Sequence, residues 1–252
     1  MANRFFTIYQ KAALVNSLLS SKLWYISHVY PLPMKFSTLI NKEIFHFLWG
    51  SNSNPIKREV LYNKKVNGGI GLLNISQKSK SILVSTVIKQ FLLSDREDLI
   101  RYYLANRIGE VFNIINVPRR TSRINAPYFE FTVDTIKKCR WHRKFPNLTS
   151  KDIYDVIVPH CKPNIECLYP NFDWKNIWLQ LNFRYINVQD RNVLFKFIYE
   201  ILPTNKRLNQ IRLRDSPMCE TCNVEDSNIH KFYYCSLVQE CIVMIRKLIF
   251  EE

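Results

Sequence analysis

Apolar side chains recur every three or four positions along much of the chain, which is the period of an α-helix with one buried face. This pattern predicts a helix within residues 9–33 that ends at Pro31. It predicts a second helix over 36–50, capped by Gly50, and a third over 76–94. The side chains expected to be buried in the first two helices are Val15, Leu18, Leu19, Trp24, Ile26, Phe36, Ile40, Ile44, Phe47 and Leu48.

The second half of the chain continues the helical pattern. Residues 149–152, TSKD, have the form of a capping box and predict the start of a helix. Two apolar stripes follow, and they assign Trp174 and Trp178 to the core. A last helix is expected over 228–250. Its buried face is expected to consist of Tyr234, Leu237, Cys241, Ile245 and Leu248. The whole pattern predicts a mainly α fold.

The composition is that of a folded and strongly basic protein. Hydrophobic residues make up 47% and aromatic residues 13% of the 252 residues, which excludes a disordered tail. Lysine and arginine number 36 against 21 acidic residues, so the formal net charge is +15. This charge favours a polyanionic partner, either nucleic acid or an anionic membrane surface. Because no apolar stretch reaches the roughly 20 residues of a membrane span, we expect nucleic acid and no membrane.

The start of the chain lacks the continuous apolar core of a signal peptide, so we expect an intracellular protein of the nucleus or cytoplasm. Its seven cysteines are then expected to be reduced thiols or metal ligands rather than disulfides. Four residues have the spacing C-x2-C-x7-H-x4-C, and they are Cys219, Cys222, His230 and Cys235. Three thiolates and one imidazole suit the tetrahedral coordination of zinc, so we predict a zinc site. The alternative is ordinary buried thiols with an unrelated histidine.

The spacing of the last two ligands sets a geometric condition. His230 and Cys235 are five positions apart, so an unbroken α-helix would point them about 140° away from each other. Both can bind one ion only if the helix is distorted or begins between them. The remaining cysteines show no comparable spacing, and Cys241 is expected in the core.

Basic residues concentrate between 119 and 151, where nine lysines and arginines accompany two acidic residues. The run KKCRWHRK could neutralise phosphates while Trp141 stacks on an unpaired base. A solvated basic linker with Trp141 in the core is the alternative. The candidates for nucleic-acid binding are Lys137, Lys138, Arg140, Trp141, Arg143 and Lys144, together with Lys206, Arg207, Arg212 and Arg214 before the cysteine motif.

Several phrases of the sequence resemble one protein family. LVNSLLSSKLWYISHVYPLP, FHFLWG and VNGGIGLLNI are similar to the thumb region of LINE-type (non-LTR) retrotransposon reverse transcriptases. DWKNIWLQL, FKFIYEILPTNKRL and the cysteine motif resemble the zinc-binding domain of the same polyproteins. That family often has an acidic residue followed by threonine just before the histidine, where this chain has EDSN. The resemblance implies a helical thumb-like module at 1–95, a basic connecting region at 96–170 and a small helical zinc-binding module at 171–252.

The resemblance does not extend to a catalytic centre. Reverse transcription requires paired aspartates that hold two metal ions, and no Asp-Asp pair occurs in the sequence. We therefore expect no enzyme activity. The resemblance implies a piece of a polyprotein that binds RNA or target DNA during target-primed reverse transcription, with the rest of the polyprotein as a further partner. Two alternatives stay open: a zinc-stabilised protein-interaction module, and a decayed gene fragment without activity.

Overall fold

The structure is a computed structural model that describes residues 6–51, 53–93, 112 and 127–250. In this part of the chain the regular structure is helical, and one isolated antiparallel bridge joins Met218 to Glu225. The predicted mainly α fold is confirmed. The chain divides into two compact units, Met1–Lys162 and Pro163–Glu252. None of the described helices is both long enough and apolar enough to span a membrane.

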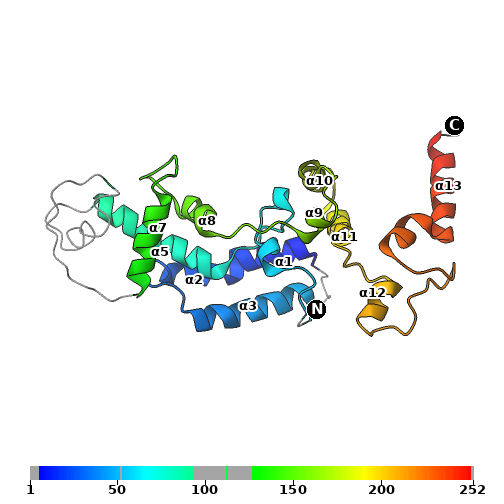
Figure 1. Cartoon of the computed structure of the whole chain (residues 1–252), viewed down its shortest axis with the longest axis horizontal. Helices are drawn as coiled ribbons and strands as arrows, with labels where there is room; N and C mark the ends of the chain where they lie inside the picture. The colour runs from blue at the N-terminus through cyan, green and yellow to red at the C-terminus, as the bar shows by residue number, and fades with distance from the viewer. Residues whose placement is uncertain (1–5, 52, 94–111, 113–126, 251–252) are drawn as a thin grey trace. The chain divides into compact units, whose positions relative to one another are not determined.

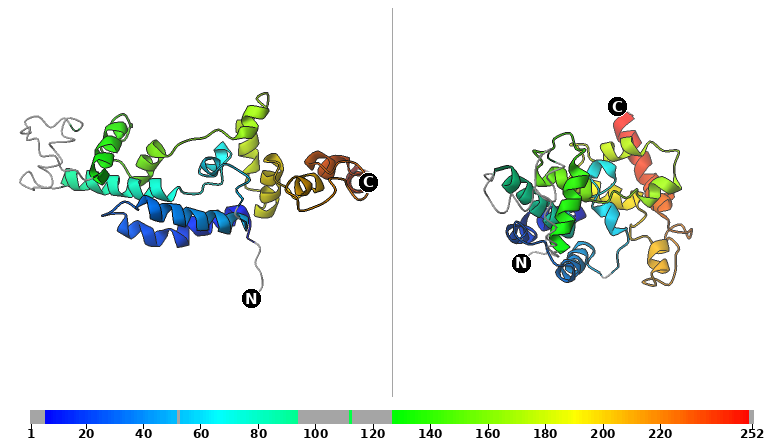
Figure 2. Two further views of the ribbon diagram at one scale, coloured as in Figure 1. Left: turned by 60° about the horizontal axis from the view of Figure 1, so that its bottom comes forward. Right: turned by 60° about the vertical axis from the view of Figure 1, so that its left-hand side comes forward.

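The long helix α5 is the centre of the first unit. It contacts α2, α3, α7 and α8, and Figures 1 and 2 show it between the blue helices of the N-terminal segment and the green helices α7 and α8. The elements of this unit are α1 (Ile8–Leu14), the π-helical η1 (Val15–Leu19), α2 (Ser21–Ile26), α3 (Met34–Trp49), α4 (Arg58–Leu61), the 3-10 turn η2 (Lys65–Asn67), α5 (Ile75–Leu93), α7 (Pro127–Cys139) and α8 (Ser150–Ile157).

One apolar cluster joins three helices that are distant in the sequence. Its centre is formed by Ile88 and Phe91 of α5, Ile136 of α7 and Ile153 of α8, which are all almost completely buried. Part of the segment expected to connect two modules therefore packs on α5 within the first unit. The predicted capping box begins α8: the hydroxyl of Thr149 accepts a hydrogen bond from the backbone N–H of Asp152, and the prediction is confirmed.

The N-terminal helices differ from the prediction. The continuous helix expected before Pro31 is divided by the π-helical turn η1. Val15 is buried as predicted, whereas Leu18 and Ile26 are exposed. In α3 the predicted Phe36 and Phe47 are exposed, Ile40 is half-buried, and Ile44 and Leu48 are buried. The inserted π-turn rotates the residues that follow it, and the position of α5 decides which face of α3 is buried. The period of apolar residues in the sequence encodes neither.

The described part of the second unit is helical, and two tryptophans of α10 lie together within it. Its elements are α9 (Asn164–Leu168), α10 (Trp174–Leu181), α11 (Val188–Ile198), α12 (Asn205–Gln210), the π-helical η4 (His230–Tyr234) and α13 (Ser236–Phe250). Trp178 is 1% exposed and its ring stacks on Trp174 at 5.5 Å between centroids. The indole N–H of Trp178 donates to Glu166 Oε1 at 2.7 Å. The assignment of Trp178 to the core is confirmed, and Trp174 is partly buried beside it.

The helix expected over 228–250 is divided at Cys235 into η4 and α13, and the predicted packing of its apolar face is wrong. Tyr234, Leu237, Ile245 and Leu248 are between 53% and 78% exposed. Cys241 is also exposed, so its expected place in the core is wrong. An apolar stripe indicates that one face of a helix can be buried, but the face is buried only if a second element packs against it. Among the described elements, η4 is the one that α13 contacts most.

Candidate metal centre

The first two predicted ligands lie on a tight turn that follows Pro217. The backbone N–H of Cys219 donates to the carbonyl of Val224 at 2.7 Å, and that of Asn223 donates back to the carbonyl of Cys219 at 2.9 Å. Asn223 has a positive φ of 53°, which an asparagine tolerates better than most residues. This conformation folds the chain back on itself, so the side chains of Cys219 and Cys222 reach the same point.

The other two ligands come from η4 and the residue after it. Five residues from His230 to Tyr234 form a π-turn, which the backbone N–H of Cys235 closes by donating to the carbonyl of His230 at 2.8 Å. Cys235 then adopts an extended conformation, with ψ at 133°, before α13 begins at Ser236. The helix is therefore distorted between the two ligands and interrupted at the second of them, Cys235. This satisfies the geometric condition that their spacing imposes.

The four predicted ligands are brought together. One donor atom from each of Cys219, Cys222, His230 and Cys235 lies within 4.8 Å of every other, so the group could hold a metal ion. The Sγ atoms of Cys222 and Cys235 are 3.8 Å apart. Tetrahedral zinc with Zn–S bonds of about 2.3 Å places its sulfur ligands about 3.8 Å from one another, so this distance fits zinc.

The histidine ring is buried in a way that fits a bound cation. His230 is 6% exposed, and its buried Nε2 atom has no hydrogen-bond partner among the described residues. A buried polar nitrogen without a partner is costly, and metal coordination would remove that cost. The backbone N–H of Cys222, followed by the nearby ring of His230, lowers the pKa of the Cys219 thiol to about 6. A thiolate, rather than a thiol, is the metal-binding form.

A second set of contacts stabilises the turn, and the sequence analysis did not identify it. Asp226 is 5% exposed, and its carboxylate accepts a hydrogen bond of 2.7 Å from the backbone N–H of Asn205 at the start of α12. The side-chain amide of Asn205 donates to the carbonyl of Met218 at 2.7 Å. These bonds hold the cysteine turn against α12. An acidic residue within a polar loop offers no sequence signal that it will be buried.

The remaining cysteines lie outside this cluster. Cys139 is buried in the first unit, where burial raises the pKa of its thiol to about 11. Cys167 and Cys241 are exposed, and Cys161 is partly exposed. Within the described chain the candidate metal centre thus comprises the four residues of the motif.

The basic candidates of the first unit lie at the C-terminal end of α7 and in the turn after it. Trp141 is 81% exposed, which contradicts the alternative that it lies in the core. The guanidinium of Arg140 lies 4.5 Å from the centre of its ring. Lys137, Lys138 and Arg143 form no ion pair with any residue that the structure describes.

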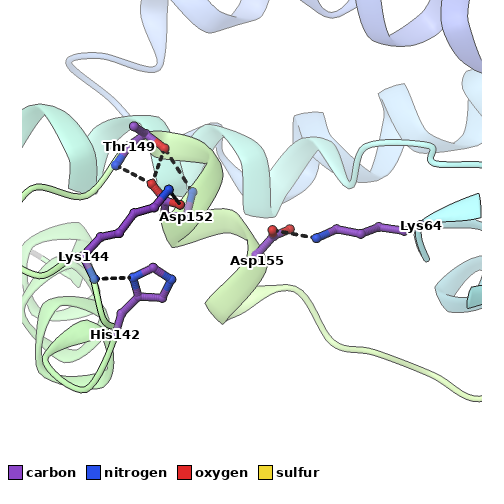
Figure 3. A network of polar contacts seen from close by, with 6 residues as sticks. All are labelled: Lys64, His142, Lys144, Thr149, Asp152 and Asp155. Carbon is purple, nitrogen blue, oxygen red and sulfur yellow. Dashed lines mark hydrogen bonds and ion pairs between the residues drawn. The ribbon is translucent and has the colours of Figure 1, made fainter. Parts of the chain in front are cut away.

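Lys144 differs from its neighbours. Its ammonium donates to the carboxylate of Asp152 at 2.9 Å, beside the capping box of α8 (Figure 3). Its backbone N–H donates to the Nδ1 atom of His142 at 3.3 Å. This lysine is therefore engaged within the protein, and it is a weaker candidate for a phosphate contact than Lys137, Lys138 and Arg143.

Most basic candidates of the second unit also form ion pairs or hydrogen bonds within the protein. Lys206 pairs with Glu225 at 3.1 Å and Arg214 pairs with Glu220 at 2.8 Å. Arg207 donates to the carbonyl of Glu200 at 2.9 Å. Arg212 is exposed and has no ion pair among the described residues. Exposed ion pairs are weak, so a phosphate could replace the carboxylate in each of them, but the free energy of the broken pair would reduce the gain.

Comparison with known proteins identifies no relative: no family model, no curated protein and no solved structure matches the chain.

Proposed function

We propose that the chain is a non-catalytic, zinc-dependent nucleic-acid-binding protein. The single observation that carries the proposal is the Cys3His cluster, in which two separate backbone distortions bring four donor atoms within 4.8 Å. Structural zinc contributes about 10–16 kcal/mol in small peptides, which is comparable to the whole stability of a domain. Zinc would therefore determine whether the C-terminal unit folds.

The nucleic-acid part of the proposal is supported by the net charge of +15 and by the exposed end of α7. Lys137, Lys138 and Arg143 are available to neutralise phosphates, because they have no carboxylate partner among the described residues. The exposed ring of Trp141 is available to stack on an unpaired base. We call these residues, with Arg140, the α7 basic cluster.

The sequence resemblance supplies the biological setting of the proposal. A piece of a LINE-type reverse transcriptase polyprotein without the aspartates of its palm would bind element RNA or target DNA inside the cell. It would do so beside the rest of the polyprotein. A decayed fragment of the same gene would share the resemblance but would not bind zinc and nucleic acid together.

The test is fluorescence anisotropy with a labelled RNA hairpin and a matched DNA duplex, titrated with salt in the presence and absence of a zinc chelator. We expect affinity to fall steeply with salt, because each neutralised phosphate releases counterions. The double substitution Lys137→Ala with Arg143→Ala should reduce the salt slope by about 2. The control is the double substitution Lys35→Ala with Lys42→Ala, which removes the same charge from the exposed surface of α3.

The outcomes separate the parts of the proposal. If the chelator abolishes binding, zinc organises the binding surface. If binding persists with the chelator, the proposed dependence on zinc is wrong and the α7 basic cluster carries the affinity alone. A folded, zinc-loaded chain that binds neither probe would contradict the nucleic-acid proposal.

A second candidate function is favoured by one observation, the exposed apolar face of α13. Leu237, Met244, Ile245 and Leu248 are between 53% and 78% exposed on one helix. An apolar face of this kind is typical of a protein-interaction surface. A zinc-stabilised interaction module would bind a partner protein with little dependence on salt, which the same titration distinguishes.

A further inference from the structure

One groove of the first unit combines cations, hydroxyls and an indole, with no carboxylate among the described residues that line it. Its volume of about 780 Å³ is typical of sites for small molecules. Three segments form its walls. They are α2 with the turn after it, one face of α5, and the N-terminal end of α8, which favours negative charge.

Lys78 of α5 is the central cation of this groove. Its side chain is half-buried, and its Nζ atom donates to the hydroxyl of Ser150 at 3.1 Å. Burial lowers the pKa of Lys78, and the charge of nearby Asp155 counteracts this effect in part. A half-buried ammonium that is hydrogen-bonded to a neutral hydroxyl is incompletely stabilised. A bound anion would complete its coordination.

The two carboxylates of α8 are bonded to other partners, as Figure 3 shows. Asp152 accepts hydrogen bonds from the hydroxyl of Thr149 and from Lys144. Asp155 pairs with Lys64 at 2.8 Å. Neither forms an ion pair with Lys78, so within the described part of the chain this lysine has only the partial, longer-range compensation from the charge of Asp155.

The rest of the groove suits the body of an aromatic ligand. Trp24 contributes a partly buried indole, whose face can stack on a base. Ile82 adds apolar surface and Gln90 adds an amide that can form hydrogen bonds with a base edge. His28 is held by a hydrogen bond of 2.8 Å between its Nδ1 atom and the hydroxyl of Thr86. Cation, hydroxyl and ring together match a phosphate joined to a base.

We propose that this groove binds a nucleoside monophosphate, either free or as the terminal nucleotide of a nucleic-acid strand. The phosphate lies at Lys78 and Ser150, and the base lies against Trp24. The groove uses neither the metal cluster nor the α7 basic cluster. The inference therefore goes beyond the proposed function, and each can fail without the other.

The test is isothermal titration calorimetry on the zinc-loaded full chain with AMP, adenosine and inorganic phosphate as separate probes. We expect saturable binding of AMP, with adenosine and phosphate each at least about tenfold weaker, because each lacks one half of the contacts. Lys78→Gln should weaken AMP binding about tenfold by removing a charge-assisted hydrogen bond. The matched control, Lys42→Gln, changes an exposed lysine of α3 outside the groove and should leave AMP affinity unchanged.

A second measurement on the unmodified sequence covers the case in which Lys78→Gln does not fold. Acetylation mapped by mass spectrometry should show that AMP protects Lys78 and does not protect Lys42. Equal acetylation of Lys78 with and without AMP would overturn the proposal, as would equal affinity for AMP and adenosine.

Pentanucleotides with and without a terminal phosphate distinguish the two sources of the ligand. Tighter binding of the phosphorylated strand than of AMP assigns the groove to strand ends. Tighter binding of AMP assigns it to the free nucleotide. If none of these probes binds, the proposal is wrong.

Discussion

The Sγ atoms of Cys222 and Cys235 lie 3.8 Å apart, although the two residues are separated by 13 positions in the sequence. Cys222 belongs to the turn after Pro217, and Cys235 lies at the break between η4 and α13. The backbone N–H of Ser236 also donates to Cys222 Sγ, at 3.2 Å. The two halves of the motif thus converge at one point, where a single ion would join them.

Substitution of one ligand should abolish metal binding. We expect Cys222→Ser to reduce zinc from about one equivalent to near zero, because three remaining ligands bind a structural zinc far more weakly. The C-terminal unit should then lose its fixed side-chain packing. Metal analysis and near-UV circular dichroism measure the two effects. Cys241→Ser is the control, since this exposed cysteine lies outside the cluster, and equal zinc loss in both variants would contradict the site.

The cysteines should differ in their rates of alkylation. In the zinc-loaded protein, Cys167 and Cys241 should react first because they are exposed. Cys139 should react last, because it is buried and its pKa is raised to about 11, which leaves almost no thiolate at neutral pH. Iodoacetamide labelling followed by peptide mass spectrometry measures the order. Early labelling of Cys139 in the folded protein would show that the core formed by α5, α7 and α8 is wrong.

The capping box of α8 should make stability depend on pH. Hydrogen bonds from Thr149 and Lys144 hold the pKa of Asp152 well below its usual range. The unfolded chain therefore binds more protons, so the stabilisation is complete above about pH 5 and is lost progressively as pH falls through about 4. The difference in melting temperature between the wild type and Asp152→Asn should be constant above about pH 5 and should shrink below about pH 4. Scanning calorimetry measures it.

The control for this pH dependence is Glu43→Gln, an exposed substitution on α3 that should not change the melting temperature. A constant difference between the wild type and Asp152→Asn down to pH 3 would contradict the predicted role of Asp152. Removal of the hydroxyl by Thr149→Ala should cost about 1 kcal/mol at neutral pH, as is typical of a lost helix cap.

Gly69 should tolerate no side chain. A Cβ atom at this position would lie 2.0 Å from the backbone oxygen of Asn63, which also accepts a hydrogen bond from Gly71. We expect Gly69→Ala to lower the free energy of unfolding by about 3 kcal/mol or more, since backbone must move. Gly71→Ala is the matched control: its φ is +71° but its Cβ would meet nothing within 4 Å, so about 1–2 kcal/mol is expected. Equal costs in thermal unfolding would contradict this arrangement of the turn.

Trp141 should contribute to binding and not to stability. Because its side chain is 81% exposed, Trp141→Ala should leave the melting temperature unchanged. Stacking on an unpaired base is worth about 1–3 kcal/mol, so affinity for single-stranded RNA should fall roughly 5- to 150-fold. Affinity for duplex DNA should change little. Trp141→Phe keeps a stacking ring and should retain most of the affinity, and an alanine variant that binds single strands normally would exclude this role.

Local features of this chain could be predicted from its sequence because they depend on neighbouring residues. The helix α5 follows from its run of helix-compatible residues, and the start of α8 follows from the spacing of Thr149 and Asp152, whose groups bond within one turn. The metal-ligand set is also local. The four possible metal ligands lie within one short segment, and their spacing predicted that the helix would be distorted after His230.

The tertiary structure decided what depends on distant partners. The sequence period marks Ile245 of α13 as apolar, but no described element covers it, so it is exposed. Asp226 is buried because the N-terminus of α12 approaches it. Trp141 is exposed in the turn after α7, although Leu148 further along the chain packs in the core. Burial and ion pairing are set by whatever lies opposite a side chain, and that partner comes from another part of the chain. The sequence therefore determined which chemical groups this protein carries, and the fold decided which of them are paired and which are available.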